Sequence, residues 1–94
     1  MTTKDDYIKK MHSRLDQINN EIDKLVARKE QLEEVGRAEF MKQMDDLRHR
    51  RDEALEKLRQ LQDASGSALE DIKSGLEMAW DSIAQAIESA RRWF

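Results

Sequence analysis

Apolar residues recur at alternating spacings of three and four through the N-terminal part of the chain. From Ile8 this step reaches Ile8, Met11, Leu15, Ile18, Ile22, Leu25, Lys29 and Leu32. Every member of this set except Lys29 is apolar. Such a period places all of these side chains on one face of a helix and is typical of a coiled-coil seam. We therefore predict a helix in this region with its apolar members forming an oligomer seam.

The apolar pattern continues, after a slip, into the middle of the chain. The next positions are Gly36, Phe40, Met44, Leu47, Arg51, Leu55 (or Ala54), Leu58 and Leu61. No proline interrupts them, and a single glycine inside a helix costs only about 1 kcal/mol. We therefore predict one long helix over about residues 4–64. The alternative is a turn near Gly36, which would give a monomeric three-helix bundle.

A change of pattern at residues 64–67 predicts a hinge. Gly66 suits a left-handed residue just past a helix end. Ser67 followed by Glu70 is a capping-box pattern that would start a new helix. We predict a C-terminal amphipathic helix over about 67–93, with an apolar face wide enough to contact more than one neighbour.

The composition adds a reason to expect association. The chain has 94 residues, of which 39% are charged, with no proline and no cysteine. A short polar chain buries little apolar area, and no disulfide is available to staple it. The C-terminal helix, about 40 Å long, would cover less than half of a first helix about 90 Å long. We therefore predict an all-α antiparallel coiled-coil hairpin in a single domain that forms a homo-dimer or homo-tetramer.

Candidate chemistry is sparse. The sequence has no glycine-rich phosphate loop, no nucleophile motif and no His-Glu-x-x-His pair, so we expect no catalytic residue, cofactor or metal. Asp46 and His49 resemble half of a carboxylate-bridged metal site, but such sites need several more inward-facing carboxylates. The basic run 48–51 has acidic neighbours and no interleaved aromatic residues, so we do not expect nucleic-acid binding.

The net charge of −3 is mild, and no secretory signal or long apolar run is present, so we expect a cytoplasmic setting. The C-terminal helix nevertheless carries large apolar side chains that suit packing on another helix or, alternatively, contact with a membrane surface. These candidate contact residues are Trp80, Ile83, Ile87, Trp93 and Phe94. The mainly acidic polar face of the helix favours packing over membrane contact.

Several short stretches give the chain a family likeness: Ile22-Asp23-Lys24-Leu25, Arg51-Asp52-Glu53-Ala54, Ile72-Lys73-Ser74-Gly75 and Ala79-Trp80-Asp81. With these stretches the chain resembles a group of small bacterial coiled-coil proteins, some of which are labelled stress-response proteins. The resemblance implies a bacterial cytoplasmic setting and no catalytic residues. We therefore expect a non-enzymatic, self-associating protein with a structural or scaffolding role in stress response. The alternative is a peripheral membrane-binding protein acting through its C-terminal helix.

Overall fold

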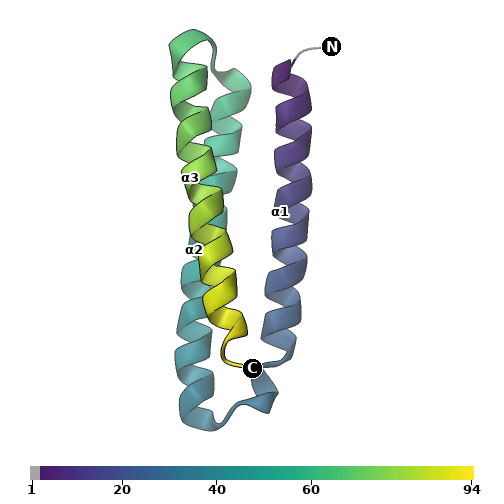
Figure 1. Ribbon diagram of the computed structural model, residues 1–94, viewed down its shortest axis with the longest axis vertical. Helices are drawn as coiled ribbons and strands as arrows, with labels where there is room; N and C mark the ends of the chain where they lie inside the picture. The colour runs from purple at the N-terminus through teal and green to yellow at the C-terminus, as the bar shows by residue number, and fades with distance from the viewer. Residues whose placement is uncertain (1–2) are drawn as a thin grey trace.

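The computed structural model describes residues 3–94, which form three helices and one short turn (Figure 1). The helices run up and down in an elongated bundle of 50 × 20 × 16 Å. No strand is present among these residues, and the prediction of an all-α chain is confirmed. The elements in chain order are α1 (Thr3–Ala27), the 3₁₀ turn η1 (Lys29–Gln31), α2 (Glu34–Asp63) and α3 (Gly66–Arg91).

The prediction of one unbroken helix over about 4–64 is wrong, because the chain turns back between α1 and α2. After η1, Leu32 is extended, with φ −97° and ψ 151°, and Glu33 has φ −69° and ψ 160°. The turn precedes Gly36, which lies within α2. The alternative of three helices therefore describes the chain better than the long helix, although its turn lies several residues earlier than predicted.

Arg37 stabilises this turn from the first part of α2. Its Nε donates to the backbone oxygen of Lys29 at 3.3 Å, and its Nη2 donates to that of Leu32 at 3.1 Å. The same Nη2 lies 3.5 Å from a carboxylate oxygen of Glu30. A helix that ends leaves carbonyl groups without partners. Arg37 supplies partners to two carbonyl groups of the turn.

The energetic reason for the turn is tertiary. Folding back buries five α1 side chains, and each is worth about 1.5–3 kcal/mol relative to full exposure. The helical backbone hydrogen bonds given up over residues 28–33 are worth only about 0.5–1.5 kcal/mol each. Burial therefore outweighs an uninterrupted helix. The five buried side chains are Met11, Leu15, Ile18, Ile22 and Leu25.

The connection between α2 and α3 is short and depends on glycine. Gly66 has φ +61°, and no other residue among 3–94 has a positive φ. It opens α3 itself, with Ser65 in the N-cap position and no side-chain cap hydrogen bond. The helix begins within one residue of the predicted start at about 67, but Ser65 and not Ser67 occupies the N-cap position, since the left-handed Gly66 turns the chain directly into α3.

Lys4 ties the beginning of α1 to the end of α2. Its Nζ donates to the backbone oxygens of Gln62 and Ala64, each at 2.8 Å. A lysine is favourable there because the last carbonyls of a helix carry partial negative charge. The N-terminal turn of α1 is thereby fastened to the α2–α3 connection.

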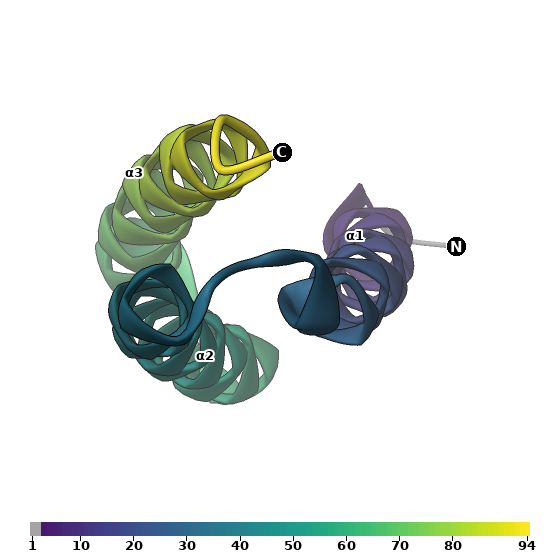
Figure 2. The same cartoon turned by 90° about the horizontal axis from the view of Figure 1, so that it is seen from below.

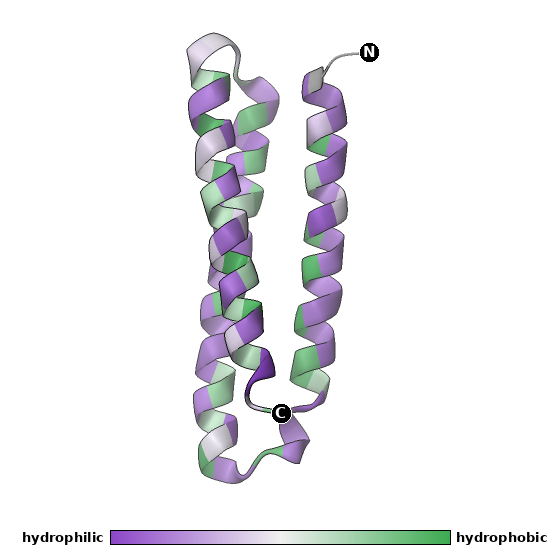
Figure 3. Cartoon of the chain, in the orientation of Figure 1, coloured by the Kyte–Doolittle hydropathy of each residue, from purple (hydrophilic) through white to green (hydrophobic). Residues whose placement is uncertain are grey.

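The three helices do not pack on one another equally. α2 and α3 lie close along their shared length, α1 packs mainly on α2, and α1 approaches α3 least (Figure 2). The apolar positions face inward in all three helices, and the outer faces are largely hydrophilic (Figure 3). The core contributed by α2 and α3 consists of Phe40, Met44, Leu47, Ala54, Leu58, Leu61, Leu76, Trp80, Ile83, Ile87 and Ala90.

Candidate interaction surface

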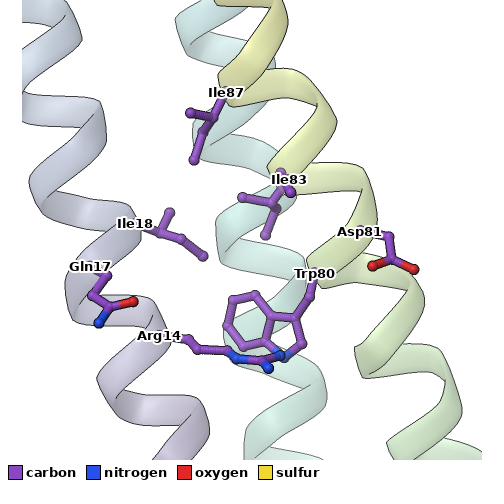
Figure 4. A pocket seen from close by; sticks show the side chains of 8 residues that line it. Arg14, Gln17, Ile18, Trp80, Asp81, Ile83 and Ile87 are labelled. Atoms are coloured by element: carbon purple, nitrogen blue, oxygen red, sulfur yellow. The ribbon is translucent and has the colours of Figure 1, made fainter.

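A recess of about 290 Å³ opens between α1 and α3, where these two helices approach least (Figure 4). Its floor and walls are mostly apolar, and polar side chains stand at its rim. Ile18 projects from α1 toward Ile83 and Trp80 of α3. The lining residues are Arg14, Gln17, Ile18, Trp80, Asp81, Ile83, Ala84 and Ile87.

Polar contacts close both ends of this recess. On one side, Arg14 lies 3.6 Å from the carboxylate of Glu77, and the Tyr7 hydroxyl donates to the same carboxylate at 2.9 Å. On the other side, the Arg91 guanidinium donates to Glu21 at 2.9 Å. The α1–α3 interface therefore has polar contacts at both ends of an open recess.

Two of the end contacts have defined protonation states. Burial, followed by the hydrogen bond to Glu77, raises the pKa of the Tyr7 phenol, so the hydroxyl stays a donor at neutral pH. The Lys73 ammonium lies 4.8 Å from the centre of the Tyr7 ring, in cation–π geometry. The hydrogen bond to Glu21 raises the already high pKa of Arg91, which therefore remains charged.

Trp80 forms the buried contact that links α1 to α3 beneath the recess. Its Nε1 donates to the sulfur of Met11 at 2.7 Å. Thioether sulfur is a weak acceptor but a favourable neighbour for aromatic rings. Among residues 3–94, no buried side-chain nitrogen or oxygen lacks a partner, so the indole can lie in the core without an unsatisfied group.

An aromatic cluster closes the end of the bundle near the α1–α2 turn. Phe40 contacts Trp93 and Phe94 edge to face, with ring centroids 6.3 and 5.2 Å apart. Trp93 Nε1 donates to the side-chain oxygen of Gln43 at 2.7 Å. The Arg28 guanidinium lies 4.4 Å from the centre of the Phe94 ring. This arrangement connects the C-terminal end of the chain to both α2 and the turn.

The structure places the predicted seam inside the same chain. Five of its members are buried between the helices, and the bare apolar stripe expected for a long helix is absent from this conformation of residues 3–94. Ile8 and Leu32, at the two ends of the seam, are only partly buried against the core. A second copy is therefore not needed to cover these side chains while α1 is folded back.

The predicted contact residues of the C-terminal helix fall into two groups. Trp80, Ile83 and Ile87 are buried in the core, and Ile83 is only 1% exposed. Trp93 is half-buried and Phe94 is 36% exposed, both in the aromatic cluster. The first group can reach a membrane or another protein only if the packing of α3 or of α1 is lost.

Two exposed apolar side chains were not singled out by the sequence pattern. Val35 is 80% exposed and Met78 is 72% exposed. Both lie outside the apolar period that marks the seam, so the pattern of the sequence did not predict that they would be exposed. Val35 lies in the first turn of α2, next to the α1–α2 turn.

The polar residues considered for other chemistry make contacts with one another on the surface. His49 Nε2 lies 2.8 Å from Glu53, and Asp46 lies 2.9 Å from Nε of Arg50. Arg51 contacts Asp52 and also donates to Asn19 of α1 at 3.1 Å. Across residues 3–94, no three or more His, Cys, Asp or Glu side chains are grouped so that they could hold a metal ion.

Neither a family model, nor a curated protein, nor a solved structure matches this chain. Over the described part of the chain, no helix combines the length and the hydropathy that a membrane crossing requires. The geometry of the helices therefore carries the functional interpretation. Its most distinctive features are the recess between α1 and α3 and the turn that brings α1 back onto the other two helices.

Proposed function

We propose that this protein is a non-enzymatic, self-associating helical protein with a structural role. The observation that supports the proposal best is the sparse packing of α1 on α3, where polar contacts lie at the two ends of an apolar recess. If α1 left its place, Ile83 and Ile87 of α3 would be uncovered, and such an apolar face suits an amphipathic helix. The resemblance to coiled-coil proteins labelled as stress-response proteins suggests that process as the setting.

The same observation indicates which part of the chain takes part in association. The α2·α3 hairpin presents one continuous apolar face, and an amphipathic helix must cover that face for the hairpin to remain soluble. In the folded-back chain α1 covers it. A helix of the same kind from a second copy has the matching apolar seam and the matching charges, because it has the same sequence.

Sedimentation velocity over a range of protein concentrations tests self-association. We expect a species of twice or four times the 11.1 kDa chain mass, with a fraction that depends on concentration during folding. A single 11.1 kDa species, both in dilute solution and after refolding at high concentration, would contradict the proposal. Lys42→Ala, which changes an exposed side chain of α2 that pairs with Glu39 of the same helix, serves as a matched control and should leave the distribution unchanged.

Membrane association is the second candidate, and the end of the bundle supports it better than the middle of α3 does. Val35 is 80% and Phe94 36% exposed at that end, and exposed Arg92 follows the α3 helix closely. Apolar side chains beside arginines are suited to the boundary between lipid head groups and acyl chains. This end could contact a surface without unpacking the core.

Flotation with vesicles of phosphatidylcholine and phosphatidylglycerol tests the second candidate. If the end of the bundle binds lipid, the chain should float with these vesicles, and Val35→Ser together with Phe94→Ser should abolish flotation. Met78→Ser is the matched control, because it removes another exposed apolar side chain at a distance from that end. Equal flotation of all three proteins, or none, would contradict membrane binding by this end.

A further inference from the structure

We propose that α1 exchanges between two copies of the chain to give a domain-swapped dimer. In this dimer residues 28–33 become helical, so that α1 and α2 form one long helix. The α1 segment of each copy then packs on the α2·α3 hairpin of the other. This inference rests on the proposed self-association and specifies the exchanged segment and the surface that receives it.

The α1–α2 turn has a composition that tolerates both conformations. Residues 28–33 read Arg-Lys-Glu-Gln-Leu-Glu, without glycine, proline, asparagine or aspartate. All of these residue types are good helix formers. No residue of the turn has a positive φ. The turn is therefore held by contacts made elsewhere and not by local residues that forbid a helix.

The apolar seam also continues through the turn, with one slip of a single residue between Leu32 and Phe40. If the turn straightens, Leu25 and Leu32 fall on one helical stripe, and Phe40 lies on the same side of the helix but displaced by the slip. Their spacing is the feature that predicts a long helix from the sequence. The folded-back and the straightened chain are thus two uses of one apolar pattern, which differ in whether α1 covers its own hairpin or that of a second copy.

The α2·α3 hairpin of a second copy can receive α1 through the same contacts that it makes in the monomer. Every contact that α1 makes across to α2 or α3 would recur between copies, including Met11 with Trp80 and Glu21 with Arg91. Exchange of an identical element is a low-cost route to a dimer for this reason. The contacts that distinguish the two forms lie only at the turn.

Straightening the turn changes three sets of contacts. Straightening breaks the hydrogen bonds from Arg37 to the backbone oxygens of Lys29 and Leu32. It restores regular helical hydrogen bonds over residues 28–33. It also brings the turn regions of two antiparallel helices together near the symmetry axis, where the exposed Val35 and the partly buried Leu32 can pack on the other copy. The monomer offers Val35 no such cover.

Proline at position 33 separates the two forms. Glu33 already has φ −69°, and the preceding Leu32 is extended, which are the conformations that proline and its predecessor require. The backbone oxygen of residue 33, which accepts from the Arg37 N–H at 2.7 Å, is retained. In a continuous helix the same proline removes a hydrogen bond and clashes with the preceding turn.

Glu33→Pro should therefore abolish the dimer and leave a folded monomer. We expect the dimerisation constant to fall by about 100-fold or more. Glu33→Ala removes the same carboxylate but favours helix, so its dimer fraction should equal or exceed that of the wild type. Circular dichroism with thermal melting verifies that both variants are folded. A Glu33→Pro dimer as abundant as the wild-type dimer would overturn the proposal.

Arg37→Ala tests the turn in the opposite direction. Loss of the guanidinium removes the contacts that hold the folded-back turn, so the dimer fraction should rise several-fold after refolding at a fixed concentration. Arg48→Ala is the matched control, because Arg48 is also an α2 arginine but contacts only Asp45 of its own helix. An unchanged or reduced dimer fraction in Arg37→Ala would count against the exchange.

Single-cysteine chains show directly whether α1 lies on another copy. The chain has no native cysteine, and Gln17 and Ala84 line opposite sides of the recess. Chains with Gln17→Cys and chains with Ala84→Cys are unfolded, mixed, refolded at high concentration and treated with a short bismaleimide. Because neither chain can cross-link internally, a covalent heterodimer shows α1 of one copy against α3 of the other, and we expect it in the dimer fraction.

The outcomes distinguish this proposal from simple self-association. A dimer that yields no covalent heterodimer, while the doubly substituted chain cross-links within itself, leaves self-association standing and overturns the exchange of α1. A chain that remains monomeric at every concentration overturns both proposals. A covalent heterodimer together with a monomeric Glu33→Pro variant supports both.

Discussion

The α2·α3 hairpin and α1 are built from similar amphipathic helices, yet they are attached in different ways. The hairpin is joined by a short connection at Gly66 and packed along its length around fully buried side chains such as Leu58 and Leu76. α1 is joined to α3 by ion pairs and hydrogen bonds at two ends, with a recess between them. The comparison shows that one apolar seam can be tightly packed on one neighbour and loosely packed on another.

Truncating matched leucines should give the largest effect. Leu58 of α2 is fully buried, whereas Leu15 of α1 is 6% exposed and lies where α1 faces α2. Both Leu→Ala variants should lose stability within the range of about 2–5 kcal/mol, with Leu58→Ala near the top and Leu15→Ala near the bottom. Urea unfolding followed by circular dichroism measures both. A larger loss for Leu15→Ala would break the comparison, because it would make α1 the better-packed element.

The connections of the two regions should differ in their tolerance of alanine. Gly66 has φ +61°, so Gly66→Ala should destabilise the hairpin by about 1–2 kcal/mol. No atom lies near enough to obstruct the added methyl group, so the loss would be attributable to backbone strain alone. Chemical denaturation gives the value. Unchanged stability would mean that the hairpin does not depend on this left-handed residue.

Gly36→Ala should have the opposite sign and a smaller size. Gly36 is helical, and a Cβ there would lie 3.6 Å from Trp93, which is an ordinary contact distance. The substitution should stabilise the chain by up to about 1 kcal/mol through helix propensity. The same urea experiment measures it. A loss of stability would show that the aromatic cluster needs the space that glycine leaves at the start of α2.

The smallest expected effect concerns pH and the attachment of α1. The pKa of Tyr7 is raised in the folded chain, so the unfolded chain loses this proton at lower pH than the folded chain does. The Tyr7 contribution is therefore fully present below about pH 10 and is lost as the pH rises above that value. Tyr7→Phe should show a shallower loss of unfolding free energy than the wild type as the pH rises from about 10 to about 12. Identical slopes would remove Tyr7 as the cause.

The sequence predicted helices well because their apolar period is local. Ile8, Met11 and Leu15 mark one face of α1 whatever that face packs against. Ile83 and Ile87 likewise mark the inner face of α3, and both are buried. The all-helical class follows from such positions and from the absence of proline, and neither depends on contacts between distant residues.

The turn between α1 and α2 could not be predicted in the same way, because its causes are not local. Residues 28–33 contain no breaker, and Arg37 stabilises the turn by reaching back to Lys29 and Leu32. An arginine on a polar helix face gives no sign of this use. The recess and the aromatic cluster depend on the tertiary positions of α1 and Phe94. The apolar period does not specify those positions, so it could not predict either feature.

The buried indole of Trp80 makes the docking of α1 visible by spectroscopy. Trp80 donates to the Met11 sulfur, whereas the other tryptophan, Trp93, lies at the end of the bundle beside Phe40. Departure of α1 would hydrate Trp80 and shift its emission to longer wavelength, while Trp93→Phe would remove the second emitter. One intrinsic fluorophore would then report, without any label, how often this helix leaves its neighbours.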